Sequence, residues 1–124
     1  MNQKNHASAF RFSNSVGFSP YRIMWLMVFF DLPTVEKIDV KEYAKFRKNL
    51  LKSGFSMMQY SVYCRHCVSY QNLEMHQRIV ESSLPPKGRV SMMAITDKQF
   101  SMIKHYSQGE ETDAPDAPQQ LQMF

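Results

Sequence analysis

The chain has 124 residues, of which 44% are hydrophobic and 21% charged, and a formal net charge of +4. That length accommodates one domain of ordinary size, and the composition excludes collagen, a mainly disordered chain and a disulfide-rich scaffold. The charge is uneven: positions 1–106 carry 15 basic against 7 acidic side chains, whereas positions 107–124 carry four acidic and no basic ones. A domain this basic is typical of proteins with a polyanionic partner, although many basic domains bind none.

Both ends of the chain differ in composition from its middle. Residues 1–20 are polar and lack a hydrophobic period, which predicts a flexible N-terminal arm, and residues 107–124 predict an acidic flexible tail. The ordered domain is expected over residues 21–106. Its longest apolar run, residues 23–30, is far shorter than the roughly 20 residues that span a membrane. Two cysteines make no disulfide framework, so a cytoplasmic protein without a membrane partner is expected.

The first half of the ordered part predicts a strand followed by a helix. Residues 21–30 are rich in β-branched and aromatic types, which favours a strand that ends at Leu32-Pro33. Asp39 is expected to cap a helix that runs to about residue 53, because its carboxylate can accept hydrogen bonds from the first turn. The inward face of this helix is expected to consist of residues at helical spacing, namely Val40, Tyr43, Phe46 and Leu50.

The second half predicts further strands around a second helix. Residues 55–64 return to strand composition and are expected to form two short strands bent near Gln59-Tyr60. A helix fits residues 71–84, and a strand fits residues 89–96. A last short strand is expected over residues 102–106.

This element order predicts an α+β fold, the ferredoxin-like βαββαβ sandwich. Two helices cover only one face of a four-stranded sheet, so the other face should be polar if it meets water. Both sides of the first strand are apolar, however, with Met24, Leu26, Val28 and Phe30 on one and Ile23, Trp25, Met27 and Phe29 on the other. A second copy of the chain is the economical cover, so a homodimer packed through its sheets is expected.

Asp31 is the strongest single candidate for a functional residue. It follows eight apolar residues at the carboxyl end of the first strand, where burial of an unpaired carboxylate would cost several kcal/mol. A bound cation would offset that cost, and Mg²⁺ commonly takes one or two carboxylates together with water and phosphate. Two copies of Asp31 near a dimer axis would supply such a set. The simpler alternative is a solvated aspartate that opens the turn at Leu32-Pro33.

A row of basic residues along the first helix is the second candidate. Five lysines at intervals of 4, 4, 3 and 4 form one stripe opposite the apolar face: Lys37, Lys41, Lys45, Lys48 and Lys52. Such a stripe suits contacts with the phosphates of a nucleic-acid backbone, and it equally suits a solvated helix face. The predicted nucleic-acid-binding surface also includes Arg22, Arg47 and Arg89.

One cysteine pair, Cys64 and Cys67, has the spacing of half a zinc site. A closed zinc site needs four ligands, and the sequence contains no second pair. The favoured interpretation is therefore that Cys64 and Cys67 are ordinary residues at the end of a strand and bind no metal. The sequence also lacks a glycine-rich phosphate loop and a nucleophile elbow.

Several segments, taken together and in order, resemble CRISPR-associated protein 2, the small adaptation subunit of CRISPR systems. They are Trp25–Phe30 with Asp31-Leu32-Pro33, Lys45–Leu51 before Gly54-Phe55, Gln59–Tyr63, Lys87-Gly88 and Ile95–Phe100. The resemblance spans residues 21–106. Its details are most similar to members that accompany type II systems.

The resemblance implies a homodimer in which Asp31 of each chain is the catalytic metal ligand and flanks one Mg²⁺ or Mn²⁺ ion. Family members are metal-dependent endonucleases on RNA or double-stranded DNA. They also form the central dimer of the spacer-acquisition complex with the CRISPR integrase, CRISPR-associated protein 1, in antiviral defence. The alternative is a non-catalytic scaffold that binds the DNA backbone for the integrase. Two positions depart from the family pattern: Met57 replaces an arginine of some members, and Phe30 replaces a frequent tyrosine.

Overall fold

The structure, a computed structural model, describes residues 22–113, so the predicted arm at residues 1–20 lies outside the described residues. Along the chain it forms β1 (Met24–Asp31), α2 (Lys37–Lys52), β2 (Ser56–Gln59), β3 (Val62–Cys67), α3 (Tyr70–Ser82), β4 (Arg89–Thr96), α4 (Asp97–Ser101), β5 (His105–Ser107) and β6 (Glu110–Thr112). Strands β1 to β4 form one antiparallel sheet in the order β2-β3-β1-β4. With α2 and α3, this is the ferredoxin-like βαββαβ arrangement, so the predicted α+β fold is confirmed.

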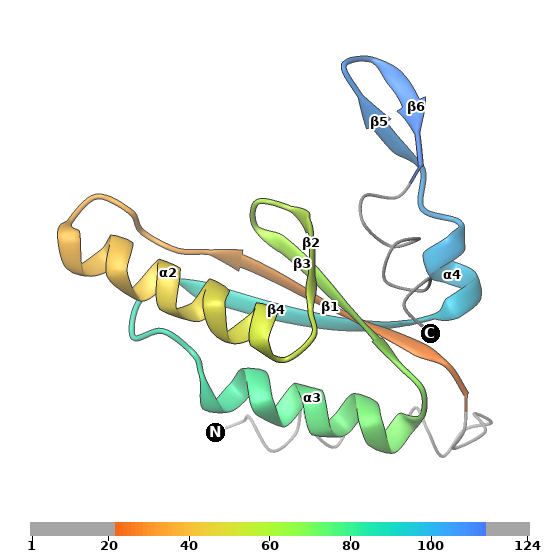
Figure 1. Cartoon of the computed structure of the whole chain (residues 1–124), viewed down its shortest axis with the longest axis horizontal. Helices are drawn as coiled ribbons and strands as arrows, with labels where there is room; N and C mark the ends of the chain where they lie inside the picture. The colour runs from red at the N-terminus through yellow and green to blue at the C-terminus, as the bar shows by residue number, and fades with distance from the viewer. Residues whose placement is uncertain (1–21, 114–124) are drawn as a thin grey trace.

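Helices α2 and α3 lie side by side on one face of the sheet (Figure 1). Their buried side chains meet alternate residues of β1 in one cluster, because successive side chains of a strand point to opposite faces. Phe46 and Leu50 come from α2, and Leu73 and Val80 come from α3. Full burial of side chains of this size stabilises the fold by about 1.5–3 kcal/mol each. This helix-covered face therefore holds the main core.

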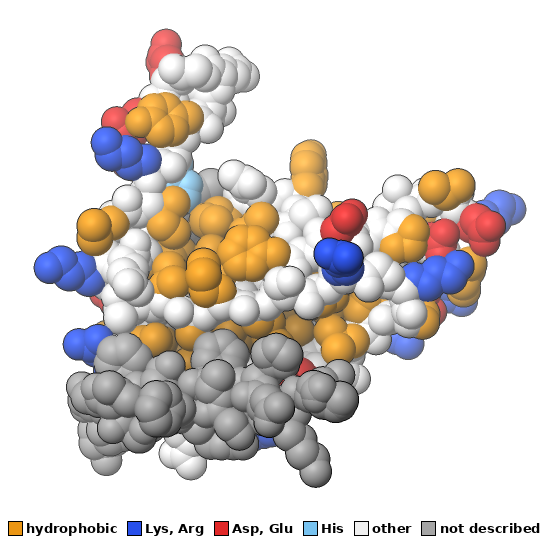
Figure 2. Space-filling view, turned by 180° about the vertical axis from the view of Figure 1, so that it is seen from behind, with side chains coloured by type: hydrophobic (Ala, Val, Ile, Leu, Met, Phe, Trp, Pro, Cys, Tyr) orange, Lys and Arg blue, Asp and Glu red, His pale blue; other side chains and the backbone are white. Residues whose placement is uncertain are grey.

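The opposite face, called the second face below, is covered by a different element. Trp25 and Met27 of β1 form a cluster there with Cys64 of β3 and Phe100 of α4. The Phe100 ring stacks on the Trp25 ring with centroids 3.7 Å apart, and the Trp25 Nε1–H donates to the Asp97 carboxylate at 2.8 Å. Helix α4 thus covers one end of the second face. Figure 2 shows apolar side chains gathered on this side of the molecule, near the base of the β5–β6 hairpin.

Helix α4 is absent from the sequence prediction, although the sequence contains a signal for it. Thr96 and Gln99 form a capping box: the Gln99 N–H donates to the Thr96 hydroxyl at 3.0 Å, and the Thr96 N–H donates to the Gln99 side chain at 2.9 Å. A Thr three residues before a Gln is the recognised pattern for such a helix start. The helix ends at Ser101, and Ile103, which follows the C-cap Met102, packs against the second-face cluster.

The start of α2 differs from the sequence prediction. Glu36 is the N-cap, and Asp39 lies within the first turn, where its carboxylate accepts a hydrogen bond from the Glu36 N–H at 3.3 Å. Asp39 is buried and Val40 is 50% exposed, so the expectation that Val40 points inward was wrong. The buried carboxylate is compensated by an ion pair in which Lys87 Nζ lies 3.6 Å from Asp39 Oδ1.

Two hairpins complete the described chain. The predicted bend near Gln59-Tyr60 is the tight connection between β2 and β3. The last strand expected over residues 102–106 begins later, at His105, and this strand, β5, pairs with β6 around Gln108 and Gly109, which both have positive φ, 54° and 84°. That backbone conformation is typical of two-residue hairpin turns. Residues 107–112 of the expected acidic tail therefore belong to a hairpin, and residues 114–124 lie outside the described residues.

Candidate functional site

Asp31 is the last residue of β1 and lies on the second face. Phe30 packs into the helix-covered core and Phe29 packs against the second-face cluster, so strand alternation places Asp31 on the same side as Phe29. Its side chain is exposed. Asp31 is therefore not a buried carboxylate whose burial a cation must offset, and its exposure makes it accessible to a ligand.

Arg89, the first residue of β4, is the cross-strand partner of Asp31. The antiparallel register of β1 and β4 sets the two residues directly opposite each other. Paired residues of this kind project from the same face with Cβ atoms about 5 Å apart. Sequence reasoning assigned Arg89 only to a general basic surface. It missed this pairing because no local pattern reports the register of strands so far apart in the chain.

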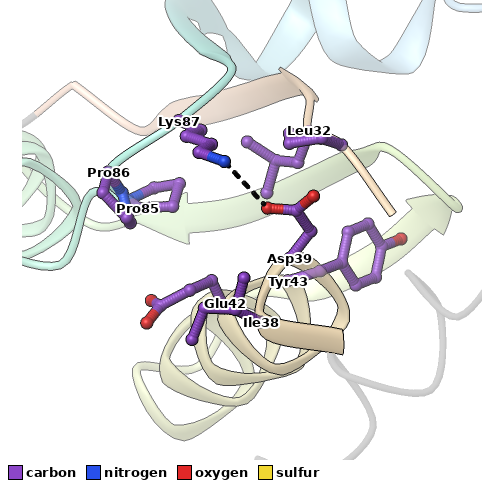
Figure 3. Close-up of a pocket in the computed structure, with 9 residues that line it drawn as sticks. Leu32, Ile38, Asp39, Glu42, Tyr43, Pro85, Pro86 and Lys87 are labelled. Carbon is purple, nitrogen blue, oxygen red and sulfur yellow. Dashed lines mark ion pairs between the residues drawn. The ribbon is translucent and has the colours of Figure 1, made fainter. Parts of the chain in front are cut away.

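The turn before β4 lies tightly against the backbone of Asp31. Gly88 has φ +88°, and a Cβ at this position would lie 2.7 Å from the carbonyl oxygen of Asp31 and 2.7 Å from Leu32 Cδ2. Glycine is therefore required both by its backbone conformation and by the close approach. Lys87 in the same turn points to the other side, toward Asp39, across a small pocket (Figure 3). The turn thus directs Lys87 to the helix layer and sets Arg89 opposite Asp31.

The site offers one carboxylate per chain. Within residues 22–113, no three side chains of His, Cys, Asp or Glu type converge in a way that would hold a metal ion. Asp31 has the oxygen ligands that Mg²⁺ and Mn²⁺ prefer, and Mg²⁺ is commonly held by only one or two carboxylates. The residue fits such an ion as a partial ligand set, which a second carboxylate from another copy of the chain would extend.

The five predicted lysines form the exposed side of α2, on the opposite layer from Asp31. All of them are exposed: Lys37, Lys41, Lys45, Lys48 and Lys52. Helix α2 packs on the helix-covered face, whereas strand alternation places Asp31 on the second face. The structure therefore separates the lysine stripe from the candidate metal ligand, and contact of the stripe with nucleic acid stays a prediction.

The three arginines predicted with this stripe lie in three different surroundings. Arg22 precedes β1 and is separated from Asp31 by the whole strand, about 25 Å of extended chain. Arg47 is exposed on α2 and lies near Tyr63, whose pKa is raised by burial and partly lowered again by this guanidinium. Arg89 lies opposite Asp31. Only Arg89 among these three is adjacent to the candidate site.

Cys64 and Cys67 point to opposite faces of the sheet and do not form half a zinc site. Cys64 belongs to the second-face cluster, and Cys67 belongs to the helix-covered core. Both thiols are free and buried, and burial raises the pKa of Cys67 to about 11. A thiol with that pKa is a poor metal ligand and a poor nucleophile near neutral pH. The structure therefore agrees with the interpretation that both cysteines are ordinary residues of a strand.

The two positions that depart from the family pattern lie away from the Asp31 side of the sheet. Phe30 is 6% exposed and contacts Tyr43, Phe46 and Tyr63 in the helix-covered core. Met57 packs against the same core. Neither side chain points to the second face, so neither substitution removes a group directly beside the Asp31 carboxylate.

Fold and site together define a small basic ferredoxin-like protein with one accessible carboxylate at the end of its first strand. The family model of CRISPR associated protein Cas2 matches residues 24–103. The chain therefore belongs to the Cas2 family, and the resemblance seen in the sequence is confirmed.

Within residues 22–113, none of the helices has the length and apolar character required to cross a bilayer.

Curated relatives agree with this assignment. The CRISPR-associated endoribonuclease Cas2 of Flavobacterium psychrophilum is 46% identical over 106 residues, covering 84% of this chain and 90% of the relative. The protein of the same name from Parvibaculum lavamentivorans is 46% identical over 101 residues, covering 82% of this chain and 100% of the relative. That from Ligilactobacillus salivarius is 49% identical over 78 residues, covering 63% of this chain and 77% of the relative.

Proposed function

We propose that this chain is a metal-dependent endonuclease that hydrolyses phosphodiester bonds in RNA or double-stranded DNA. The relatives from Flavobacterium psychrophilum and Parvibaculum lavamentivorans are named endoribonucleases, which favours RNA. The observation that carries the proposal is the accessible Asp31 carboxylate, positioned at the strand end by Gly88 and opposite a guanidinium. Such a site combines a cation ligand with a group that can bind an anion.

Asp31 would hold Mg²⁺ or Mn²⁺ through its carboxylate oxygens. The chemistry supplied by such a cation is polarisation of the phosphoryl group and activation of a water nucleophile. The chain's own residues bind and orient the substrate. Gly88 keeps the Asp31 backbone in position, and exposed basic side chains neutralise the phosphates on either side of the bond to be cut.

In this proposal the site is completed by a homodimer packed through the second faces, with one ion shared by both copies of Asp31. The apolar character of that face supports the dimer, since Trp25, Met27 and Phe29 follow one another on it and Met93 is still 47% exposed. A dimer of this kind would also be the central unit of the spacer-acquisition complex with the CRISPR integrase.

The Asp31→Asn variant tests the catalytic role, because it keeps the shape of the side chain and removes its charge. We expect Mg²⁺-dependent cleavage of RNA and duplex DNA substrates to fall at least about 100-fold, a usual loss for a group that acts on the reacting centre. Asp113→Asn is the matched control, since Asp113 is an exposed aspartate directly after β6. Cleavage by Asp31→Asn at the wild-type rate, or cleavage by wild type that persists in EDTA, would exclude the proposal.

A second candidate function is a non-catalytic scaffold that binds the DNA backbone for the CRISPR integrase. The separation of the lysine stripe on α2 from Asp31 favours it, because backbone binding through the stripe needs no contribution from the Asp31 site. Charge reversal of Lys41, Lys45 and Lys48 would then weaken duplex binding. The slope of log affinity against log salt concentration would also become shallower, by roughly 0.9 for each phosphate that is no longer neutralised. Asp31→Asn would leave that binding unchanged, and wild-type protein would show no metal-dependent cleavage.

A further inference from the structure

We propose that Arg89 is the residue that binds the substrate phosphate at the Asp31 site, through two parallel hydrogen bonds from its guanidinium. The inference rests on the proposed function, because it assigns a role to Arg89 within that same site. The substrate class it defines is a phosphodiester of a nucleic-acid backbone, recognised without reading the bases.

Asp31 and Arg89 carry opposite charges at neighbouring positions of the sheet. Asp31 and Arg89 are directly paired between β1 and β4, and strand alternation places both on the second face. Both side chains are exposed. Although they carry opposite charges, neither forms an ion pair or a side-chain hydrogen bond within residues 22–113. Both charges are therefore available to a ligand.

Arg89 differs from other basic residues near the same elements. Lys87, two positions earlier, is paired with Asp39 at 3.6 Å. Arg65 of β3 donates from Nε to the Ser53 carbonyl at 3.0 Å and from Nη1 to the His66 carbonyl at 2.6 Å. Lys87 and Arg65 are therefore engaged in contacts that stabilise the fold. Arg89 has no such partner within residues 22–113, and Gly88 fixes the backbone immediately before it.

The Asp31–Arg89 pair is chemically complementary to a cation with a bound phosphodiester. A phosphodiester presents two non-bridging oxygens, which the planar guanidinium fork of an arginine can bind with two parallel hydrogen bonds. A cation held by the Asp31 carboxylate on β1 would attract the same phosphodiester that Arg89 binds from β4. A carboxylate and a guanidinium with Cβ atoms about 5 Å apart thus match a cation and a phosphate lying side by side.

The experiment compares full-length wild type with Arg89→Ala, Arg89→Lys and, as a matched control, Arg78→Ala, which removes an exposed arginine from α3. Binding of a labelled RNA oligonucleotide is measured by fluorescence anisotropy in EDTA, so that no cleavage occurs. Binding of Mn²⁺ alone is measured by electron paramagnetic resonance. We expect Arg89→Ala to weaken RNA binding about tenfold and Arg89→Lys less, since lysine keeps the charge but does not have the fork.

The Mn²⁺ measurement separates phosphate binding from a structural role. Removal of a neighbouring positive charge favours a cation on Asp31, so Arg89→Ala is expected to bind Mn²⁺ as tightly as wild type or more tightly. If Arg89 had only a structural role, its removal would weaken the binding of RNA and of Mn²⁺ together. Equal RNA affinities of Arg89→Ala and Arg78→Ala, or weaker Mn²⁺ binding by Arg89→Ala, would overturn the inference. Absence of cleavage by wild type would instead refute the nuclease function, and the RNA affinities would still decide whether Arg89 binds phosphate.

Discussion

The two faces of the central sheet are built from the same strands but are completed in different ways. On the helix-covered face, β1 meets two long helices, and residues such as Leu26 and Val28 are fully buried there. On the second face, the short α4 packs on one end of β1, at Trp25. The described residues close the first face, whereas they close the second face only in part.

Residues 30 and 31 show what this difference teaches. Phe30 is 6% exposed among aromatic rings, and the next residue, Asp31, is exposed on the other face. Side chains on the helix-covered face therefore contribute to the stability of the fold. Charged side chains at the end of the second face contribute little to it and remain available for a ligand or a second copy of the chain.

The largest expected effect is a decrease of stability on the helix-covered face. Leu50 is 1% exposed, and Leu50→Ala should lower the free energy of unfolding by about 2–5 kcal/mol, because it buries less apolar surface and leaves a cavity. Leu84, which is 49% exposed after α3, is the matched control, and Leu84→Ala should cost less than about 1 kcal/mol. Urea unfolding of both variants measures this, and equal decreases would contradict the place of Leu50 in the main core.

The Gly88→Ala variant should link stability to the site on the second face. The new Cβ would meet the Asp31 carbonyl at 2.7 Å and would also require a left-handed backbone, a strain of about 1–3 kcal/mol. Gly109 has a similar φ of +84°, but a Cβ there would have no atom within 4 Å, so Gly109→Ala shares only the backbone strain. We expect the larger decrease in unfolding free energy and weaker Mn²⁺ binding for Gly88→Ala. Equal stability and Mn²⁺ affinity of the two variants would show that the close approach does not position Asp31.

The proposed dimer predicts a smaller effect that is specific to the second face. Met93 and Met75 are exposed to a similar extent, 47% and 42%, but Met93 lies on β4 facing away from the helices and Met75 lies on α3. Met93→Glu should weaken self-association at least about tenfold, since it would bury a charge at the interface. Sedimentation velocity over a concentration series measures this. Dissociation caused by Met75→Glu but not by Met93→Glu would place the interface elsewhere.

The smallest expected effect is a pH dependence of stability on the helix side. His76 of α3 is 4% exposed, its Nδ1 lies 2.9 Å from the Asn72 carbonyl, and its ring contacts Phe55. Burial, with a further contribution from the nearby Arg65, lowers the pKa of His76 below its usual value of about 6.5.

Because the unfolded chain binds the His76 proton more readily than the folded chain, this contribution to stability is complete above about pH 6.5. It decreases as the pH falls through the lower pKa of the folded state. Unfolding measured between pH 7.5 and 5 should therefore show a steeper decrease for wild type than for His76→Gln. Parallel curves for the two proteins would exclude His76 as the cause.

Local patterns predicted most of the fold. The alternation of β1, the helical spacing of Phe46 and Leu50, and the order of the elements are properties of neighbouring residues, and they predicted the ferredoxin-like plan. The same patterns failed at Asp39 and Val40, where the long-range ion pair to Lys87 turns an acidic residue inward. They also did not reveal that α4 covers Trp25, since that contact joins residues far apart in the chain.

By itself, the sequence determined that Asp31 follows an apolar strand, that the lysines of the first helix form one stripe, and that both sides of β1 are apolar. Only the tertiary structure decided that Asp31 is paired with Arg89, that the lysine stripe lies on the opposite layer, and that Cys64 and Cys67 point apart. The physical reason is that periodicity is set by bonds between neighbours, whereas strand register and layer order are set by packing between residues distant in sequence.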